Sequence, residues 1–192
     1  MDLNKSIKEC PLIFLDLETT GLYAESSSIC EVAALLVKQG KIIDKFHTLV
    51  HPHQKVPYSA FCIHNISDKD LIGAPYFKDI SQKLTKFLSK GILCAYNIRF
   101  DIGFINYQLK KNYLDCLDLP LIDILIMAKK TLNLKSYKLK SVAQYFGLTS
   151  DINFHRAEDD AYVTYLIFSK LIEIISKKES LQAKKIIDLY GI

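Results

Sequence analysis

Two carboxylates separated by one residue, Asp16 and Glu18, follow the apolar run 12–15. If a β-strand continues through them, both side chains point to the same face of the sheet, because side chains two residues apart share a face. Carboxylates held against a core are costly unless a cation or a metal ion compensates their charge. The alternative is that the strand ends first and that both carboxylates are solvated. The pair alone leaves both interpretations open.

Two further acids occupy similar positions. Asp101 follows a second apolar run, residues 91–96, and lies where a helix is expected to begin, so it could instead cap that helix. Asp160 lies on the apolar stripe of a helix predicted over residues 157–175 and is expected to face inward. Its two acidic neighbours before it in the sequence are explained by the positive end of the helix dipole.

These four acids would act together if their elements meet. The strand that carries Asp16 and Glu18 can lie beside the strand that precedes Asp101, which brings the acids to one edge of the sheet. Oxygen ligands in that number suit Mg²⁺ or Mn²⁺. Two such ions about 3.5–4 Å apart clamp the attacking and leaving oxygens of a phosphate displacement. The predicted chemistry is therefore a metal-dependent displacement at a phosphate group.

A histidine accompanies the acids. His155 lies five residues before Asp160, in the predicted turn ahead of the helix. Beside a metal site, a histidine can act as a general base near neutral pH. A lone histidine is more often structural or exposed, so both interpretations stand.

The elements that would position these residues follow the pattern of an α/β domain. Two β-prone segments are joined by Gln39-Gly40, a connection short enough for an antiparallel hairpin. Strands are predicted over residues 12–15, 29–38, 41–50 and 91–96. Helices are predicted over residues 76–89, 100–109, 122–132, 139–146, 157–175 and 181–189. We expect a mixed sheet with helices on both faces.

Length and composition agree with one globular domain. The 192 residues, 49% hydrophobic and 24% charged, predict a single domain over residues 1–192, with its motifs between about 11 and 175. The formal net charge of +4 is too small to indicate a nucleic-acid binder by itself. The five widely spaced cysteines indicate reduced core residues rather than a zinc site. Without a run long enough to cross a bilayer, we expect a cytoplasmic protein.

Three motifs together resemble a known family. They are Asp16-Leu17-Glu18-Thr19-Thr20-Gly21, Asn97-Ile98-Arg99-Phe100-Asp101 and His155-Arg156-Ala157-Glu158-Asp159-Asp160. Each motif alone is weak or moderate, but their order and spacing are specific. The sequence is similar to the histidine subclass of the DEDD exonucleases, the family of the bacterial DNA polymerase III epsilon proofreading subunit, ribonuclease T and oligoribonuclease.

The resemblance implies a ribonuclease H-like fold with a mixed five-stranded sheet. It implies two Mg²⁺ or Mn²⁺ ions held by Asp16, Glu18, Asp101 and Asp160, with Asp16 bridging them and His155 as the base. It also implies a pocket for the 3′-terminal nucleotide, for which a packing or turn role of each residue is the rival interpretation. That pocket is expected to be lined by Thr19, His64, Asn97 and Phe100.

Two positions depart from the family pattern, which often has histidine where Tyr96 stands and glycine where Asn65 stands. Asparagine tolerates the left-handed backbone conformation better than most residues, so the turn at Asn65 is expected to form. Tyr96 is expected to affect how the substrate is held rather than the chemistry.

The function predicted is a metal-dependent 3′→5′ exonuclease that releases nucleoside 5′-monophosphates from single-stranded or frayed DNA ends, in proofreading or repair. The alternative is an RNA-directed exonuclease with the same active site. A third interpretation, a non-catalytic nucleic-acid-binding module, would be expected to lack a ligand or His155. Expected partners are single-stranded 3′ ends, with DNA favoured over RNA, and a DNA polymerase catalytic subunit.

Overall fold

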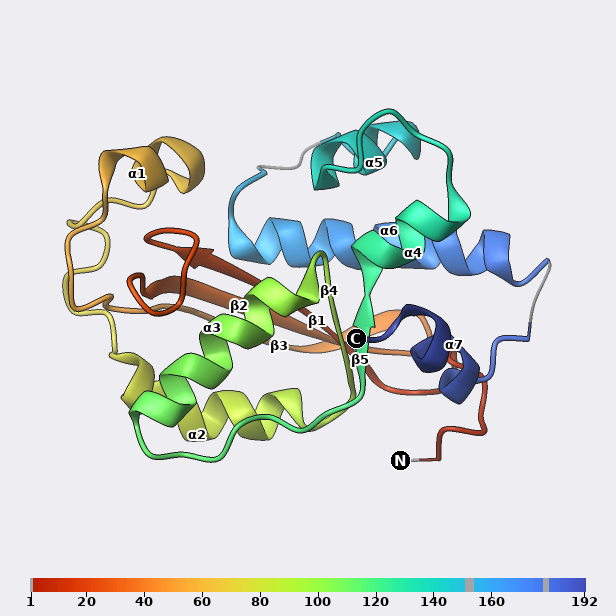
Figure 1. The fold of residues 1–192 in the computed structure, drawn as a ribbon, viewed down its shortest axis with the longest axis horizontal. Helices are drawn as coiled ribbons and strands as arrows, with labels where there is room; N and C mark the ends of the chain where they lie inside the picture. Colours follow the sequence, from red (N-terminus) through yellow and green to blue (C-terminus); the bar gives the residue numbers. More distant parts are fainter. Residues whose placement is uncertain (1, 151–153, 178–179) are drawn as a thin grey trace.

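A mixed sheet of five strands is formed by the described residues of the computed structural model, which are 2–150, 154–177 and 180–192 (Figure 1). The strand order is β3-β2-β1-β4-β5. β1 pairs antiparallel with β2, β2 antiparallel with β3, and β4 lies parallel to both β1 and β5. The strands are β1 (Leu12–Thr19), β2 (Ile29–Lys38), β3 (Lys41–Leu49), β4 (Ile92–Ala95) and β5 (Leu121–Asp123). The predicted mixed α/β sheet is confirmed.

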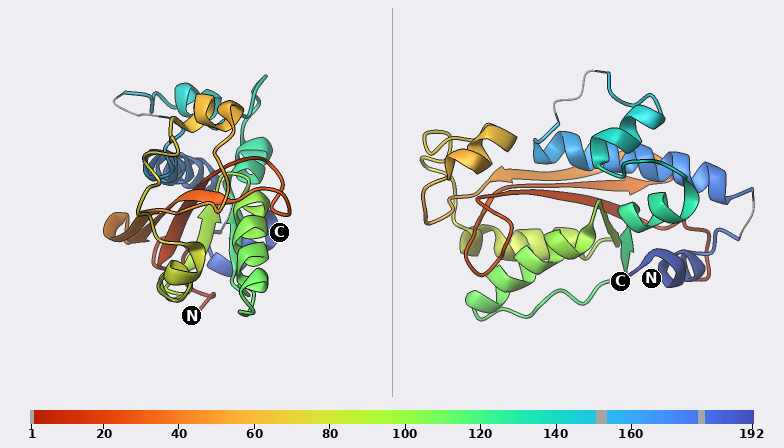
Figure 2. Two further views of the ribbon diagram at one scale, coloured as in Figure 1. Left: turned by 90° about the vertical axis from the view of Figure 1, so that its left-hand side faces the viewer. Right: turned by 45° about the horizontal axis from the view of Figure 1, so that its top comes forward.

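Helices cover both faces of this sheet, also as predicted (Figure 2). One face packs on α2 (Phe77–Leu88) and α3 (Ile98–Lys111). The other packs on α4 (Ile124–Thr131), α5 (Leu139–Tyr145), α6 (Ala157–Ile175) and α7 (Ala183–Tyr190). A short helix, α1 (Tyr58–His64), stands at the end of the sheet where β1 ends (Figure 1).

The alternation of side chains along β1 determines what each face carries. Ile13, Leu15 and Leu17 belong to the core under α2 and α3, whereas Leu12 and Phe14 belong to the core under α6. Phe14 packs against Tyr165 and Phe168 of α6, with ring centroids 5.3 and 5.4 Å apart. Residues two and four positions beyond Phe14 therefore point toward α6 as well.

Three details differ from the sequence-based expectations. β5 occupies the start of the helix predicted from residue 122, because the Asp123 side chain accepts the N–H groups of Leu125 and Ile126 and so begins α4 later. α1 lies in a stretch where no helix was predicted. Cys62 and Cys116 are exposed, so only the other three cysteines are core residues.

In the described part of the chain, no helix has both the length and the apolar character needed to span a bilayer.

Candidate active site

Three carboxylates meet between β1 and the first turn of α6. Asp16 and Glu18 point toward α6 from the carboxyl end of β1, and Asp160 points back from α6. One oxygen of each lies within 4.8 Å of the others. Glu18 and Asp160 are buried and Asp16 is half-buried. β1 continues through both of its acids, so the interpretation that they follow the strand as solvated groups is wrong.

Burial, together with neighbouring negative charge, raises the pKa of each of these carboxyl groups. Burial, followed by the charges of Asp101, Asp160 and Glu18, raises the pKa of Asp16 well above its usual value. Burial and the neighbouring Asp160 raise the pKa of Glu18 to about 8. The pKa of Asp160 is raised to about 6, mainly by burial. A bound cation would remove the electrostatic penalty of ionising them together.

The donor set fits a hard divalent cation. Oδ2 of Asp160 accepts the backbone N–H of His155 at 3.1 Å, whereas Oδ1 is buried without a hydrogen-bond partner among the described residues. Buried polar atoms normally have a partner, and this one belongs to a group of three carboxylates. Because all the donors are oxygens, Mg²⁺ or Mn²⁺ matches them better than zinc.

Asp101 lies beside this group but outside it. It belongs to the first turn of α3, is 3% exposed, and is the charged neighbour that contributes most to the raised pKa of Asp16. α3 begins after Asn97, so Asp101 is not the helix cap that the sequence also allowed. The structure thus brings the fourth predicted acid next to Asp16.

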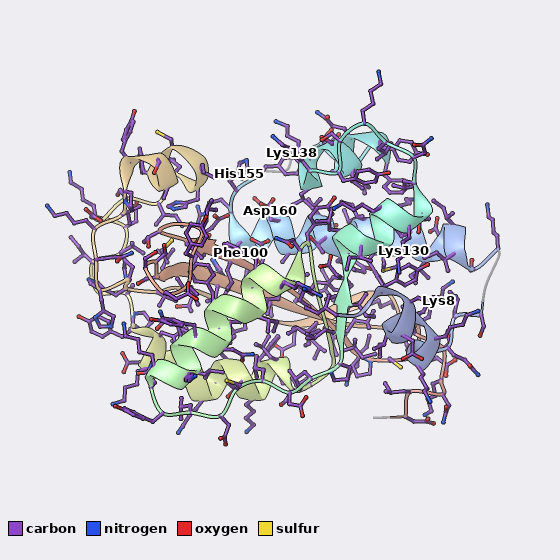
Figure 3. The ribbon with its side chains drawn as sticks, viewed as in Figure 1. Lys8, Phe100, Lys130, Lys138, His155 and Asp160 are labelled. Atoms are coloured by element: carbon purple, nitrogen blue, oxygen red, sulfur yellow. The ribbon has the colours of Figure 1, made fainter. Side chains whose placement is uncertain are left out.

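His155 lies two residues before α6, exposed to solvent and with a left-handed backbone (φ 70°). The hydrogen bond from its backbone N–H to Asp160 holds it next to the carboxylate group. Figure 3 shows His155 and Asp160 at the same end of α6. The imidazole is therefore accessible to a substrate that reaches the acids.

A cavity of about 320 Å³ adjoins Glu18. Of the predicted pocket residues, Thr19, His64 and Phe100 line it, and Asn97 is not among its described lining residues. The end of β1, the loop after it and helix α1 supply the rest of the wall, through Leu17, Thr20, Gly21, Leu22, Ser59, Ala60 and Ile63. The cavity thus lies between the carboxylates and α1.

The segment around His64 is fixed by its own hydrogen bonds. Nδ1 of His64 accepts the N–H of Ile66 at 3.0 Å, and burial lowers the pKa of His64, so the ring is neutral near pH 7. Asn65 adopts the left-handed conformation expected of it, with φ of 55°. The departure from glycine at this position therefore leaves the turn intact.

Comparison with known proteins agrees with this geometry. The RNase T family model, described as Exonuclease, matches residues 13–168. The chain belongs to this exonuclease family. It is 35% identical to the DNA polymerase III subunit epsilon of Treponema pallidum, over 82% of this chain and 74% of that protein. It is 32% identical to the PolC-type DNA polymerase III of Thermotoga petrophila over 92% of this chain, which spans only 13% of that longer protein.

Solved exonucleases share the fold. Exonuclease X in complex with 5′-overhanging duplex DNA superposes with a TM-score of 0.73 at 22% identity, over 92% of this chain and 99% of the other. E. coli exonuclease I in complex with a dT13 oligonucleotide gives a TM-score of 0.77 at 17% identity, over 87% and 42%. The predicted ribonuclease H-like architecture is thereby confirmed.

One residue beside the carboxylate group, Glu31, was not identified from the sequence. It lies opposite Glu18 in the β1–β2 register, is fully buried, and faces α6. Its carboxylate accepts hydrogen bonds from Arg156 and His47 and from the N–H of Ala157. Burial raises the pKa of Glu31, but these hydrogen bonds outweigh burial and lower it to about 2. A charged residue inside the apolar run of β2 was the signal available in the sequence.

Proposed function

We propose that this chain is a metal-dependent 3′→5′ exonuclease that removes nucleoside 5′-monophosphates from single-stranded or frayed DNA ends. The observation that carries this proposal is the group formed by Asp16, Glu18 and Asp160, with one buried carboxylate oxygen unpartnered among the described residues, beside a cavity of about 320 Å³. Family membership supports the same reaction class.

In this proposal, Asp16, Glu18 and Asp160 hold the metal ions, and Asp101 supports them from α3. When bound, the ions stabilise the charge on the attacking and leaving oxygens of the scissile phosphate. His155 accepts the proton of the attacking water, because it is exposed and tied through its N–H to Asp160. Each of these roles is assigned from position and chemistry.

The cavity accepts the 3′-terminal nucleotide in this proposal. Phe100 and His64 offer ring surfaces to a base, and Thr19 offers a hydroxyl next to Glu18. A fully paired terminal nucleotide must first be unstacked and unpaired, which costs a few kcal/mol. Single-stranded and mismatched ends should therefore react faster than blunt duplex ends.

Relatives named DNA polymerase III favour DNA as the substrate and a DNA polymerase catalytic subunit as a partner. A decisive experiment compares 5′-labelled single-stranded DNA, mismatched duplex DNA and RNA of the same sequence at one Mg²⁺ concentration. We expect shortening from the 3′ end, fastest on single-stranded DNA, and release of 5′-monophosphates. Full activity in excess EDTA, or cleavage of a closed circular strand, would refute the proposal; faster RNA degradation would select the RNA-directed alternative.

A further inference from the structure

The segment from Ile124 to Ser150 has an unusual charge. It contains five lysines and no aspartate, glutamate or arginine. Since the whole chain carries a formal +4, subtracting the +5 of this segment leaves −1 for all other residues. The net positive charge of the protein therefore resides in α4, α5 and the residues that join and follow them.

This segment lies beside the active site. α5 packs against α6, the helix that carries Asp160. Figure 3 shows Lys138 at the start of α5, with Asp160 between it and Phe100, a wall residue of the nucleotide cavity. In this view, Asp160 thus lies between Phe100, on one wall of the cavity, and α5 of the lysine-bearing segment.

A hydrogen bond connects the segment from Ile124 to Ser150 to the carboxyl end of β4. Tyr96 directly follows β4, and its hydroxyl donates to the carbonyl of Tyr137 at 2.5 Å. The Tyr137 hydroxyl in turn donates to the carbonyl of Leu132 and accepts the N–H of Leu134. The peptide group before Lys138 is therefore held from β4, the strand that leads into Asp101.

Three lysines of this segment are available to a ligand. Lys135, Lys138 and Lys140 are exposed, and none of the three forms an ion pair with a described carboxylate. Lys140 lies 5.7 Å from the ring centroid of Phe154. Lys130, in contrast, donates to the carbonyl of Leu189 at the far side of α4. The three exposed ammonium groups can each meet a separate phosphate.

We propose that Lys135, Lys138 and Lys140 form an upstream strand surface, which binds phosphates of the nucleic-acid strand on the 5′ side of its terminal nucleotide. The inference rests on the proposed function, because a strand whose 3′ nucleotide fills the cavity must cross the acids before it reaches the lysines. The acids repel phosphates, so binding of a long strand needs cations placed beyond them. Tyr96 acts as a positioning residue for this surface, which gives a role to its departure from the family pattern.

The test replaces the three lysines together, Lys135→Gln, Lys138→Gln and Lys140→Gln. A matched control replaces Lys78, Lys83 and Lys86, three exposed lysines of α2 on the opposite side of the sheet, and so changes the net charge equally. Each protein is assayed with a deoxytrinucleotide and a long single-stranded oligonucleotide. Binding of the long strand is also measured by fluorescence anisotropy in Ca²⁺ over a range of salt concentrations.

For the long strand, we expect the KM of the triple variant to rise about tenfold at unchanged kcat, and the salt slope of log Kd to decrease by about two, since each phosphate contact contributes about 0.7. The trinucleotide is too short to reach the lysines and should react as with the parent. Tyr96→Phe should raise the KM for the long strand by a smaller factor.

The proposal that the lysines bind the strand would be refuted if the triple variant kept the parental KM and salt slope, or if the α2 control had an equal effect. The positioning role of Tyr96 would be refuted if Tyr96→Phe kept the parental KM. If the parent protein hydrolysed neither substrate, the proposed function would fail, but anisotropy would still decide whether the lysines bind the strand.

Discussion

Glu31 of β2 and Arg156, the residue before α6, form a bidentate ion pair, with Nη2 to Oε1 at 2.7 Å and Nε to Oε2 at 3.2 Å. Oε2 of Glu31 also accepts the N–H of Ala157 at 3.0 Å. The pair therefore clamps the turn that carries His155 to the strand next to β1. It fixes the separation between the acids of β1 and those of α6.

Glu31→Gln should be strongly destabilising. Removing one partner of a fully buried ion pair typically costs about 3–5 kcal/mol. The loss here should lie at or below the lower end of that range, because the remaining Arg156 side chain is 39% exposed and partly solvated. Denaturant unfolding measures this loss. The control is Glu158→Gln, which removes the partly exposed pairing of Glu158 with Lys45 and with His47 and should cost at most about 1 kcal/mol. Similar small losses for both variants would contradict the assigned role of Glu31.

The metal-free protein should lose stability as the pH rises. The folded-state pKa values of Glu18, about 8, and Asp160, about 6, exceed their usual 4.5 and 3.8. The folded state therefore binds protons more tightly, and this contribution to stability is present below pH 4 and lost as the pH rises through 6 and 8. Glu31 has the opposite sign: because its pKa is about 2, its contribution is fully present above pH 4.5 and is lost as the pH falls from 4.5 toward 2.

Thermal unfolding in EDTA across this pH range checks both predicted changes: the loss of stability at high pH from Glu18 and Asp160, and the loss at low pH from Glu31. Added Mg²⁺ should stabilise the protein more at pH 8 than at pH 6, because the metal binds the ionised carboxylates. A Mg²⁺-induced shift in Tm that is independent of pH would exclude these carboxyl groups as its ligands.

Asp16→Asn should stabilise the metal-free protein while abolishing metal-dependent turnover. The substitution removes a charge that burial, Asp101, Asp160 and Glu18 all disfavour. Tm in EDTA should therefore rise, and the further increase on adding Mg²⁺ should shrink or vanish. A fall in Tm in EDTA would show that Asp16 stabilises the fold by contacts other than metal binding.

His155→Ala should separate proton transfer from metal binding. Loss of a general base typically costs about 10²–10⁴-fold in rate. The variant should keep the parental Mg²⁺-induced Tm shift, because the backbone N–H that Asp160 accepts remains. Near-parental turnover at saturating Mg²⁺, or loss of the Tm shift, would show that His155 is not the base.

Local sequence patterns were sufficient to predict the secondary structure of segments whose own residues determine it. The β-prone residues of β2 and β3, joined by a short connection, and the long apolar stripe of α6 gave these elements close to their observed bounds. The convergence of Asp16, Glu18 and Asp160 was also predictable, because each follows from the face of its own strand or helix.

Long-range pairing decided what was missed. β5 has three residues and is a strand only because β4 lies beside it. The role of Glu31 depends on Arg156, a residue 125 positions away, so no local pattern contains it. The exposure of Cys62 and Cys116 likewise depends on which side of α1 and of the loop after α3 meets solvent.

The central position of β1 separates the site into parts of different local stability. β1 has strands on both sides and helices on both faces. Exchange of the backbone amide protons of Asp16 and Glu18 with solvent therefore requires unfolding of most of the domain. α1 has seven residues, lacks a side-chain cap, and buries only Ala60 and His64. Amide protons of the α1 part of the cavity wall should therefore exchange far sooner than those of β1 beside the carboxylates. If the cavity binds the terminal nucleotide as proposed, mutations in α1 can alter which nucleotide is accepted while the carboxylate group keeps its geometry.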